Sequence, residues 1–250
     1  MHSINELSNN RIKEITKLHQ KKYRDELGLF IAEGEKILEE LLNANAEIIE
    51  VIALKDKKLN FNIKNIKYVD ESVMKKIATT SSVCEVLTVA KKREIDFLDV
   101  TCKNKLVLLD NISDPGNLGT IIRSACAFGI EGIILFGNCV DLYSPKVIRS
   151  CTGNFFKIPI LQISNLEELN KNLNEYTKIA TSLSKENNIE IKDCNNFKKF
   201  IIMFGSEAKG LCKELTNITE KNIKIEMKND VESLNLAISA SIIFYELSRK

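Results

Sequence analysis

The chain has 250 residues, 44% of them hydrophobic, and a formal net charge of +2, which is typical of a globular protein with one large or two small domains. This net charge does not indicate nucleic-acid binding by itself, so a basic surface would have to be local. Seven scattered cysteines without a CxxC pair, and only two histidines, argue against a metal site or disulfide framework and favour reduced thiols. No signal-peptide pattern and no run of about 18 apolar residues occurs, so we expect a cytoplasmic protein without a membrane span.

Residues 4–27 predict a basic helix that carries isoleucine and leucine at helical spacing along one stripe. A solvated helix face is the simpler interpretation of the basic residues. The alternative is a surface that contacts phosphates, with His19 and Tyr23 available for stacking. The candidate phosphate contacts are Arg11, Lys17, Lys21, Lys22 and Arg24.

The following segments alternate short apolar runs with helical patterns. Strands are expected at 30–34, 48–54, 66–69 and 86–90, and helices at 35–43 and 72–78, the second after a serine N-cap. These elements predict a small α/β domain over residues 1–92. Residues 91–104 are charged and lack a clear periodicity, so we assign residues 93–104 as a linker.

In residues 105–250 strands and helices alternate regularly. Apolar strands are expected at 106–110, 132–136, 156–160, 178–181, 200–204 and 224–227, with helices at 121–128, 145–150 and 166–173 and a last apolar helix opened by Ser233-Leu234-Asn235. Strands that are apolar throughout and separated by helices predict a parallel sheet covered on both faces. The second domain is therefore expected to be a parallel-sheet α/β domain.

A polar loop after the strand at 106–110 is the first candidate for a functional site. Pro115-Gly116 is a turn signal, Asn117 is a plausible helix cap, and Arg123 follows on the helix. One interpretation is an ordinary loop and cap, with Arg123 in a surface ion pair. The functional interpretation is that Asn117 and Arg123 face one pocket.

Two further polar loops follow strands. In the first, Gly205 comes after a buried strand and would let a ligand approach the backbone. The loop is neither a GxGxxG nor a Walker A loop, so it does not predict a nucleotide site. The alternative interpretation of this loop is a simple strand-to-helix turn with Glu207 near the helix N-terminus. In the second, Ser233 is better interpreted as a helix cap than as a nucleophile. Both histidines, His2 and His19, belong to the N-terminal region, which argues against a Ser-His-Asp or Cys-His enzyme.

Each loop alone is a weak signal, but the three loops in this order match the motif pattern of one protein family. The segments DNISDPGNLGTIIRSACAFGI (110–130), IIMFGSEAKGL (201–211) and IKIEMKNDVESLNLAISASIIFYELSR (223–249) resemble the three motifs of the SPOUT superfamily of RNA methyltransferases, in its SpoU–TrmH branch of ribose 2′-O-methyltransferases. SPKVIRSCTGNFFKIPI (144–160) resembles an intermediate family segment. The N-terminal part resembles a substrate-binding domain of the ribosomal L30e type.

The resemblance implies a C-terminal domain with a deep trefoil knot, a homodimer formed through that domain, and S-adenosylmethionine as cofactor. By position, the cofactor contacts fall on Thr181, Leu183, Gly205, Gly210, Ile225, Met227 and Leu234. The catalytic positions fall on Asn117, Arg123, Glu207, Ser233 and Asn235. Arg123 has two open roles, a base assisted by the RNA phosphate or a clamp for phosphate and alkoxide.

The implied substrate is RNA, with 23S ribosomal RNA as the first expectation and transfer RNA as the alternative. The chemistry needs an accessible nucleotide, so a loop or unpaired site is expected in preference to a regular helix. Two other functions stay open: a non-catalytic RNA-binding or ribosome-assembly protein on the same fold, and a SPOUT enzyme that methylates a base. Binding of S-adenosylmethionine would distinguish a methyltransferase from the non-catalytic protein. Nuclease-resistant dinucleotides in the product RNA would distinguish ribose methylation from base methylation.

Overall fold

The computed structural model of the protein describes residues 7–63, 65–182, 187–207, 209–228 and 233–249. Contacts divide the chain into two compact units. Unit 1 comprises Met1–Glu94 and Asp141–Phe156, and unit 2 comprises Ile95–Val140 and Lys157–Lys250. Residues 141–156, expected within the catalytic domain, thus belong with the N-terminal elements.

Unit 1 is built on a four-stranded sheet of order β1-β4-β2-β3, in which only the β2–β3 pair is parallel. Residues alternate between its two faces: Ile31, Ile52 and Leu87 pack with α1 and α4, whereas Val51 and Val86 pack with α3. The elements are α1 (Asn9–Lys17), α2 (Lys21–Leu27), β1 (Leu29–Glu33), α3 (Glu35–Asn43), β2 (Ile48–Leu54), β3 (Ile66–Val69), α4 (Glu71–Ile77), β4 (Val86–Lys91), α7 (Pro145–Ser150) and the 3₁₀ turn η1 (Asn154–Phe156).

An aromatic cluster joins the two sequence segments of unit 1. The ring of Phe30 on β1 lies 5.0 Å from that of Tyr143, 5.8 Å from that of Phe155 and 6.2 Å from that of Phe156, measured between centroids. Offset and edge-to-face pairs at these distances stabilise a core beyond the area that they bury. The segment after Asp141 therefore completes the core of unit 1.

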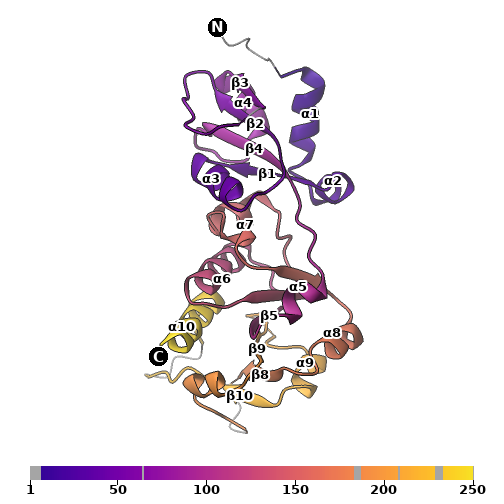
Figure 1. The fold of residues 1–250 in the computed structure, drawn as a ribbon, viewed down its shortest axis with the longest axis vertical. Coiled ribbons are helices and arrows are strands. Elements are labelled where there is room, and N and C mark those ends of the chain that lie inside the picture. The colour runs from indigo at the N-terminus through magenta and orange to yellow at the C-terminus, as the bar shows by residue number, and fades with distance from the viewer. Residues whose placement is uncertain (1–6, 64, 183–186, 208, 229–232, 250) are drawn as a thin grey trace. The chain divides into compact units, whose positions relative to one another are not determined.

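Unit 2 contains the parallel sheet that the sequence predicts, with strand order β10-β8-β9-β5-β6-β7 and every pair parallel. Figure 1 shows α6 and α10 side by side, although they are far apart in sequence. The elements are α5 (Phe97–Thr101), β5 (Lys105–Asp110), α6 (Pro115–Ala127), β6 (Gly132–Phe136), β7 (Ile160–Ile163), α8 (Leu166–Asn172), β8 (Thr177–Thr181), η2 (Ile191–Asn196), β9 (Phe200–Phe204), α9 (Lys213–Asn217), β10 (Lys221–Ile223) and α10 (Leu236–Ser248).

Both faces of this sheet are covered, as predicted. Leu106 and Leu108 of β5 pack in one cluster with residues of α8 and α9, such as Leu169 and Leu215. On the other face, the ring of Phe204 on β9 meets that of Phe244 on α10 edge to face at 5.9 Å. Because all the strands are parallel, their carboxyl ends lie along the same edge of the sheet, and α10 begins beside that edge.

Several element boundaries differ from the predictions. The basic segment forms two helices instead of one. Residues 18–20 separate α1 from α2, and Gly28, with a φ of 64°, is the C-cap that ends α2 after Leu27. The expected linker contains α5, which begins with a capping box between its N-cap Asp96 and Asp99. The strand expected at 224–227 ends at Ile223, and the strand expected at 156–160 begins only at Ile160.

Candidate active site

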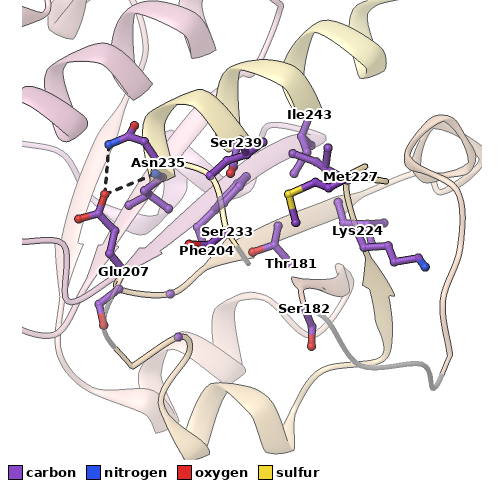
Figure 2. A pocket seen from close by; sticks show the side chains of 17 residues that line it. Thr181, Ser182, Phe204, Glu207, Lys224, Met227, Ser233, Asn235, Ser239 and Ile243 are labelled. Atoms are coloured by element: carbon purple, nitrogen blue, oxygen red, sulfur yellow. Dashed lines mark hydrogen bonds between the residues drawn. The ribbon is translucent and has the colours of Figure 1, made fainter. Parts of the chain in front are cut away.

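A cavity of about 360 Å³ lies at the carboxyl ends of β8, β9 and β10. Figure 2 shows that Ser239 and Ile243 of α10 line it from one side, and Thr181 and Phe204 from the strand ends. Parallel α/β sheets bind ligands at this edge, and the volume is within the range of small-molecule sites. The lining residues are Thr181, Ser182, Phe204, Gly205, Ser206, Glu207, Gly210, Ile223, Lys224, Ile225, Met227, Ser233, Leu234, Asn235, Leu236, Ser239 and Ile243.

Six of the seven residues predicted to bind the cofactor line this cavity. They are Thr181, Gly205, Gly210, Ile225, Met227 and Leu234. The seventh, Leu183, lies outside the described residues. The residues come from three different strand ends and from the segment before α10, so the fold brings together positions that are distant in sequence.

The structure gives a reason for glycine at position 205 that the sequence did not reveal. A Cβ atom at this position would lie 1.9 Å from the carbonyl carbon of Gly210 and 2.1 Å from the backbone nitrogen of Leu211. The loop folds back on itself, with Ser206 and Gly210 exchanging backbone hydrogen bonds of 3.1 and 2.8 Å. Gly205 is therefore required by the loop's own backbone, irrespective of any ligand.

Three predicted catalytic residues form one hydrogen-bond network beside the cavity. Asn117 Nδ2 donates to Glu207 Oε1 at 2.9 Å, and Asn235 Nδ2 donates to Asn117 Oδ1 at 3.0 Å and to Glu207 Oε1 at 3.2 Å. Figure 2 shows the Glu207 carboxylate turned toward Asn235 at the start of α10. One carboxylate thus joins segments that follow β5, β9 and β10.

The network determines the orientation of both amides. Asn235 Oδ1 caps α10 by accepting from Ala237 N at 2.9 Å and Ile238 N at 3.2 Å, so its nitrogen must face Asn117 and Glu207. Asn117 then presents its oxygen to Asn235 and its nitrogen to Glu207. The prediction that Asn117 caps a helix is wrong, because α6 begins earlier: Asp114 is its N-cap and Pro115 its first residue.

The other two predicted catalytic residues lie differently. Ser233 is exposed and lines the cavity, and it is not the cap of α10, since Asn235 has that role. Arg123 is exposed on α6 and lines neither this cavity nor the smaller one of about 120 Å³ that Asn117 and Glu207 share. Six residues are about one and two-thirds helical turns, so Arg123 lies on a different face of α6 from Asn117.

Asp110 is a residue of this region that the prediction missed. Its carboxylate is 1% exposed and accepts from Cys212 N at 2.7 Å and from Asn111 Nδ2 at 2.5 Å. It therefore ties the end of β5 to the end of the loop that contains Gly205. The available signal was a charged residue that ends a fully apolar strand, since a buried carboxylate needs donors.

Burial raises the pKa of Cys212 to about 11, so its thiol is protonated at neutral pH.

The five predicted RNA contacts of unit 1 are not equivalent. Arg24 is 3% exposed; it donates through Nε to Asp141 at 2.9 Å and through Nη1 to Leu18 O at 2.6 Å. The prediction that Arg24 lies on an exposed basic surface is therefore wrong. Arg11 is held between Glu14 at 2.7 Å and the buried Glu50 at 2.5 Å. Lys21 pairs with Asp25 at 2.6 Å, whereas Lys17 and Lys22 are exposed beside the ring of Tyr23.

Within the part of the chain that the structure describes, no cluster of three or more His, Cys, Asp or Glu side chains could hold a metal ion. In the same residues, no helix has the length and apolar character needed to cross a membrane.

Comparison with known proteins connects both units to methyltransferases. A family model described as the SpoU rRNA Methylase family matches residues 104–245, and one described as the MRM3-like substrate binding domain matches residues 9–88. The chain is 27% identical over 251 residues to the 23S rRNA (guanosine(2553)-2′-O)-methyltransferase RlmP of Bacillus subtilis, and the match covers 99% of each protein.

Solved structures agree with these matches. The AdoMet-bound rRNA methyltransferase from Sinorhizobium meliloti has a TM-score of 0.84 at 29% identity, over 97% of this chain and 95% of the other. The SpoU methyltransferase AviRb from Streptomyces viridochromogenes, in complex with AdoMet, has a TM-score of 0.85 over 96% of this chain and 97% of the other. At 21% identity, AviRb supports the fold alone.

Proposed function

The chain belongs to the SpoU rRNA Methylase family, and on this premise we propose that it transfers a methyl group from S-adenosylmethionine (AdoMet) to a ribose 2′-hydroxyl of ribosomal RNA. The 23S RNA is the first expectation, because RlmP, which is similar along its whole length, is by its name a 23S rRNA 2′-O-methyltransferase. Transfer RNA is the alternative substrate. The observation that carries the proposal is the Asn117–Glu207–Asn235 network beside a cavity at the strand ends.

The residues of the cavity fit AdoMet in size and chemistry. Ile225, Leu234 and Leu236 offer apolar surface for an adenine ring, while the hydroxyls of Thr181 and Ser206 offer hydrogen bonds. Bound AdoMet supplies an electrophilic methyl group on a sulfonium centre. The protein then has to hold the ribose hydroxyl near that methyl group and stabilise the charge that develops on the hydroxyl oxygen.

The hydrogen-bond network separates positioning residues from residues that are free to meet the substrate. Both hydrogens of Asn235 Nδ2 are engaged, one by Asn117 and one by Glu207, and its oxygen caps α10. Asn235 is therefore assigned as a positioning residue for the two loops. Ser233 is exposed beside the cavity and is assigned to hold the substrate hydroxyl.

Arg123 supplies the positive charge in this proposal. A guanidinium keeps its proton at neutral pH, which favours a bidentate clamp for phosphate and alkoxide over a base. Arg123→Lys separates the roles. Lysine retains the charge but loses the bidentate fork, so a clamp predicts partial activity with a flat pH dependence. A base predicts activity that rises as the lysine deprotonates.

The proposal is tested by measuring AdoMet binding calorimetrically and then methyl transfer to ribosomal RNA from cells that lack this gene. Mapping of 2′-O-methyl sites in cells with and without the gene identifies the nucleotide. A nuclease-resistant dinucleotide in the digested product supports ribose methylation, and a methylated base contradicts it. Absence of AdoMet binding would overturn the proposal in favour of a non-catalytic RNA-binding protein.

We further propose that the protein acts in the cytoplasm as a homodimer formed by the knotted domain of this family. Ile238 and Tyr245 on α10 support the dimer, because they are 52% and 50% exposed and lie seven residues apart on one helix face. Light scattering should give the dimer mass, and Ile238→Glu should shift it toward the monomer. A monomer at micromolar concentration in the wild type would contradict this arrangement.

A further inference from the structure

The turn between α1 and α2 presents an aromatic ring next to two cations. The ammonium of Lys17 lies 5.4 Å from the centroid of the Tyr23 ring, and that of Lys22 lies 5.8 Å from it. Tyr23 is half-buried, and both lysines are exposed. A cation within about 6 Å of a ring face is attracted to it, so the three side chains form one local unit.

Lys17 and Lys22 differ from Arg11, Lys21 and Arg24 of the same two helices in having no carboxylate partner. Among the described residues, no acidic group pairs with Lys17 or Lys22, whereas Arg11, Lys21 and Arg24 each form an ion pair. An ion-paired cation already has part of its charge neutralised by the carboxylate, which weakens its attraction for a phosphate. The two unpaired lysines therefore have the greater capacity to attract an anion.

Two more unpaired lysines extend the same surface. Lys13 is exposed one turn before Lys17 on α1, and Lys76 is exposed at the end of α4. The ends of the two helices are joined by Thr16 Oγ1, which donates to Lys76 O at 3.4 Å, and by the ring of His19, whose Nε2 lies 2.8 Å from Ile77 O. Neither Lys13 nor Lys76 has an acidic partner among the described residues.

From this arrangement we propose that the α1–α2 turn is a binding site for a single-stranded RNA segment. Tyr23 stacks on one unpaired base, and Lys13, Lys17, Lys22 and Lys76 contact the phosphates on either side. Stacking of this kind requires an exposed base face, which a regular duplex does not provide, and the positive charge tracks the backbone. The inference rests on the proposed function only in taking RNA as the substrate.

The test measures binding of the full chain to a short labelled RNA of mixed sequence, single-stranded or paired with its complement, at several salt concentrations. Lys17→Ala and Lys22→Ala should each lower the salt slope of single-strand binding by about 0.7. Lys21→Ala is the matched control, since it removes the same charge from the neighbouring, ion-paired position and should change the slope much less.

The stacking step has its own variants. Tyr23→Phe retains the ring and should bind like the wild type. Tyr23→Leu retains apolar bulk without a π-face and should weaken single-strand binding about tenfold, with an unchanged salt slope and unchanged duplex binding. Equal affinity of Tyr23→Leu and wild type, or an equal loss for duplex and single strand, would overturn the stacking site. Equal slopes for Lys22→Ala and Lys21→Ala would overturn the phosphate contacts.

Failure of this site and failure of the proposed function give different results. If the variants lose single-strand affinity but the wild type transfers no methyl group, the binding site stands and the proposed function falls. If the wild type methylates RNA and all variants bind and methylate equally, the function stands and the binding site falls. AdoMet affinity should be the same in every variant, because these residues belong to unit 1 and the cavity to unit 2.

Discussion

The cavity side of unit 2 and the basic surface of unit 1 contrast in how their residues are positioned. At the cavity, polar side chains follow parallel strands, so the sheet brings Asn117, Glu207 and Asn235 together across large sequence separations. On unit 1, the availability of a basic residue depends on whether a carboxylate lies within reach, and for Arg11 and Arg24 that carboxylate is distant in sequence, Glu50 and Asp141. The order of the strands thus explains why the polar residues at the cavity of unit 2 lie together. The exposure of the basic residues of unit 1 depends instead on individual side-chain contacts.

Arg24→Ala gives the sharpest test of this contrast on unit 1. It removes one partner of a buried ion pair, because Asp141 is only 11% exposed, and should lower the free energy of unfolding by about 3–5 kcal/mol. Urea denaturation measures the loss. Lys22→Ala, at an exposed position two residues away, should change stability by less than about 0.5 kcal/mol. If both variants were equally stable, Arg24 would not be a structural residue.

Arg123→Ala tests the contrast on unit 2, where Arg123 lies exposed outside the network. Methyl transfer should fall by about two orders of magnitude or more, as when an acid–base or charge-stabilising group is removed, while AdoMet affinity remains unchanged. Arg249→Ala is a suitable control, since Arg249 is an exposed arginine of the same unit that pairs with Glu246. Turnover near the wild-type value in Arg123→Ala would remove this residue from the mechanism.

Asn235 combines helix capping with the hydrogen-bond network, and two substitutions separate these contributions. Asn235→Ala should lower the free energy of unfolding by about 1 kcal/mol through loss of the cap, and should also lower activity. Asn235→Ser should recover the stability, because serine caps well, but its short side chain cannot reproduce the bonds to Asn117 and Glu207. Full activity in Asn235→Ser would show that capping alone is required.

Alkaline pH is expected to act on both units. Burial raises the pKa of Cys84 in unit 1 to about 11, and the pKa of Cys194 and Tyr176 in unit 2 to about 12. Because the ordinary values are 9.0 for cysteine and 10.0 for tyrosine, the unfolded chain loses these protons first. Stability should therefore be unaffected below pH 9 and decrease as pH rises toward 12. Urea midpoints at pH 8 and pH 10.5 test this; an increase would contradict it.

Apolar strand runs such as 106–110 and 200–204 predicted the parallel sheet correctly, because a strand buried on both faces has few alternatives. The start of α6 was not predictable in the same way. Asp114 and Asn117 are both good caps, and Pro115 as first residue favours the earlier start. The cofactor positions came from family resemblance. The burial of Arg24 could not be predicted, because its partner Asp141 is 117 residues away.

The split composition of unit 1 has a consequence for how the protein is made. Tyr143, Phe155 and Phe156, which pack on Phe30, are synthesised only after β5, α6 and β6 of unit 2. The nascent first unit therefore lacks these ring contacts to Phe30 until about fifty further residues have been synthesised, and such long-range contacts form late in folding. A gene fragment cut at residue 94 would encode this unfinished state permanently, whereas a fragment that also carries residues 141–156 restores the missing side of the core.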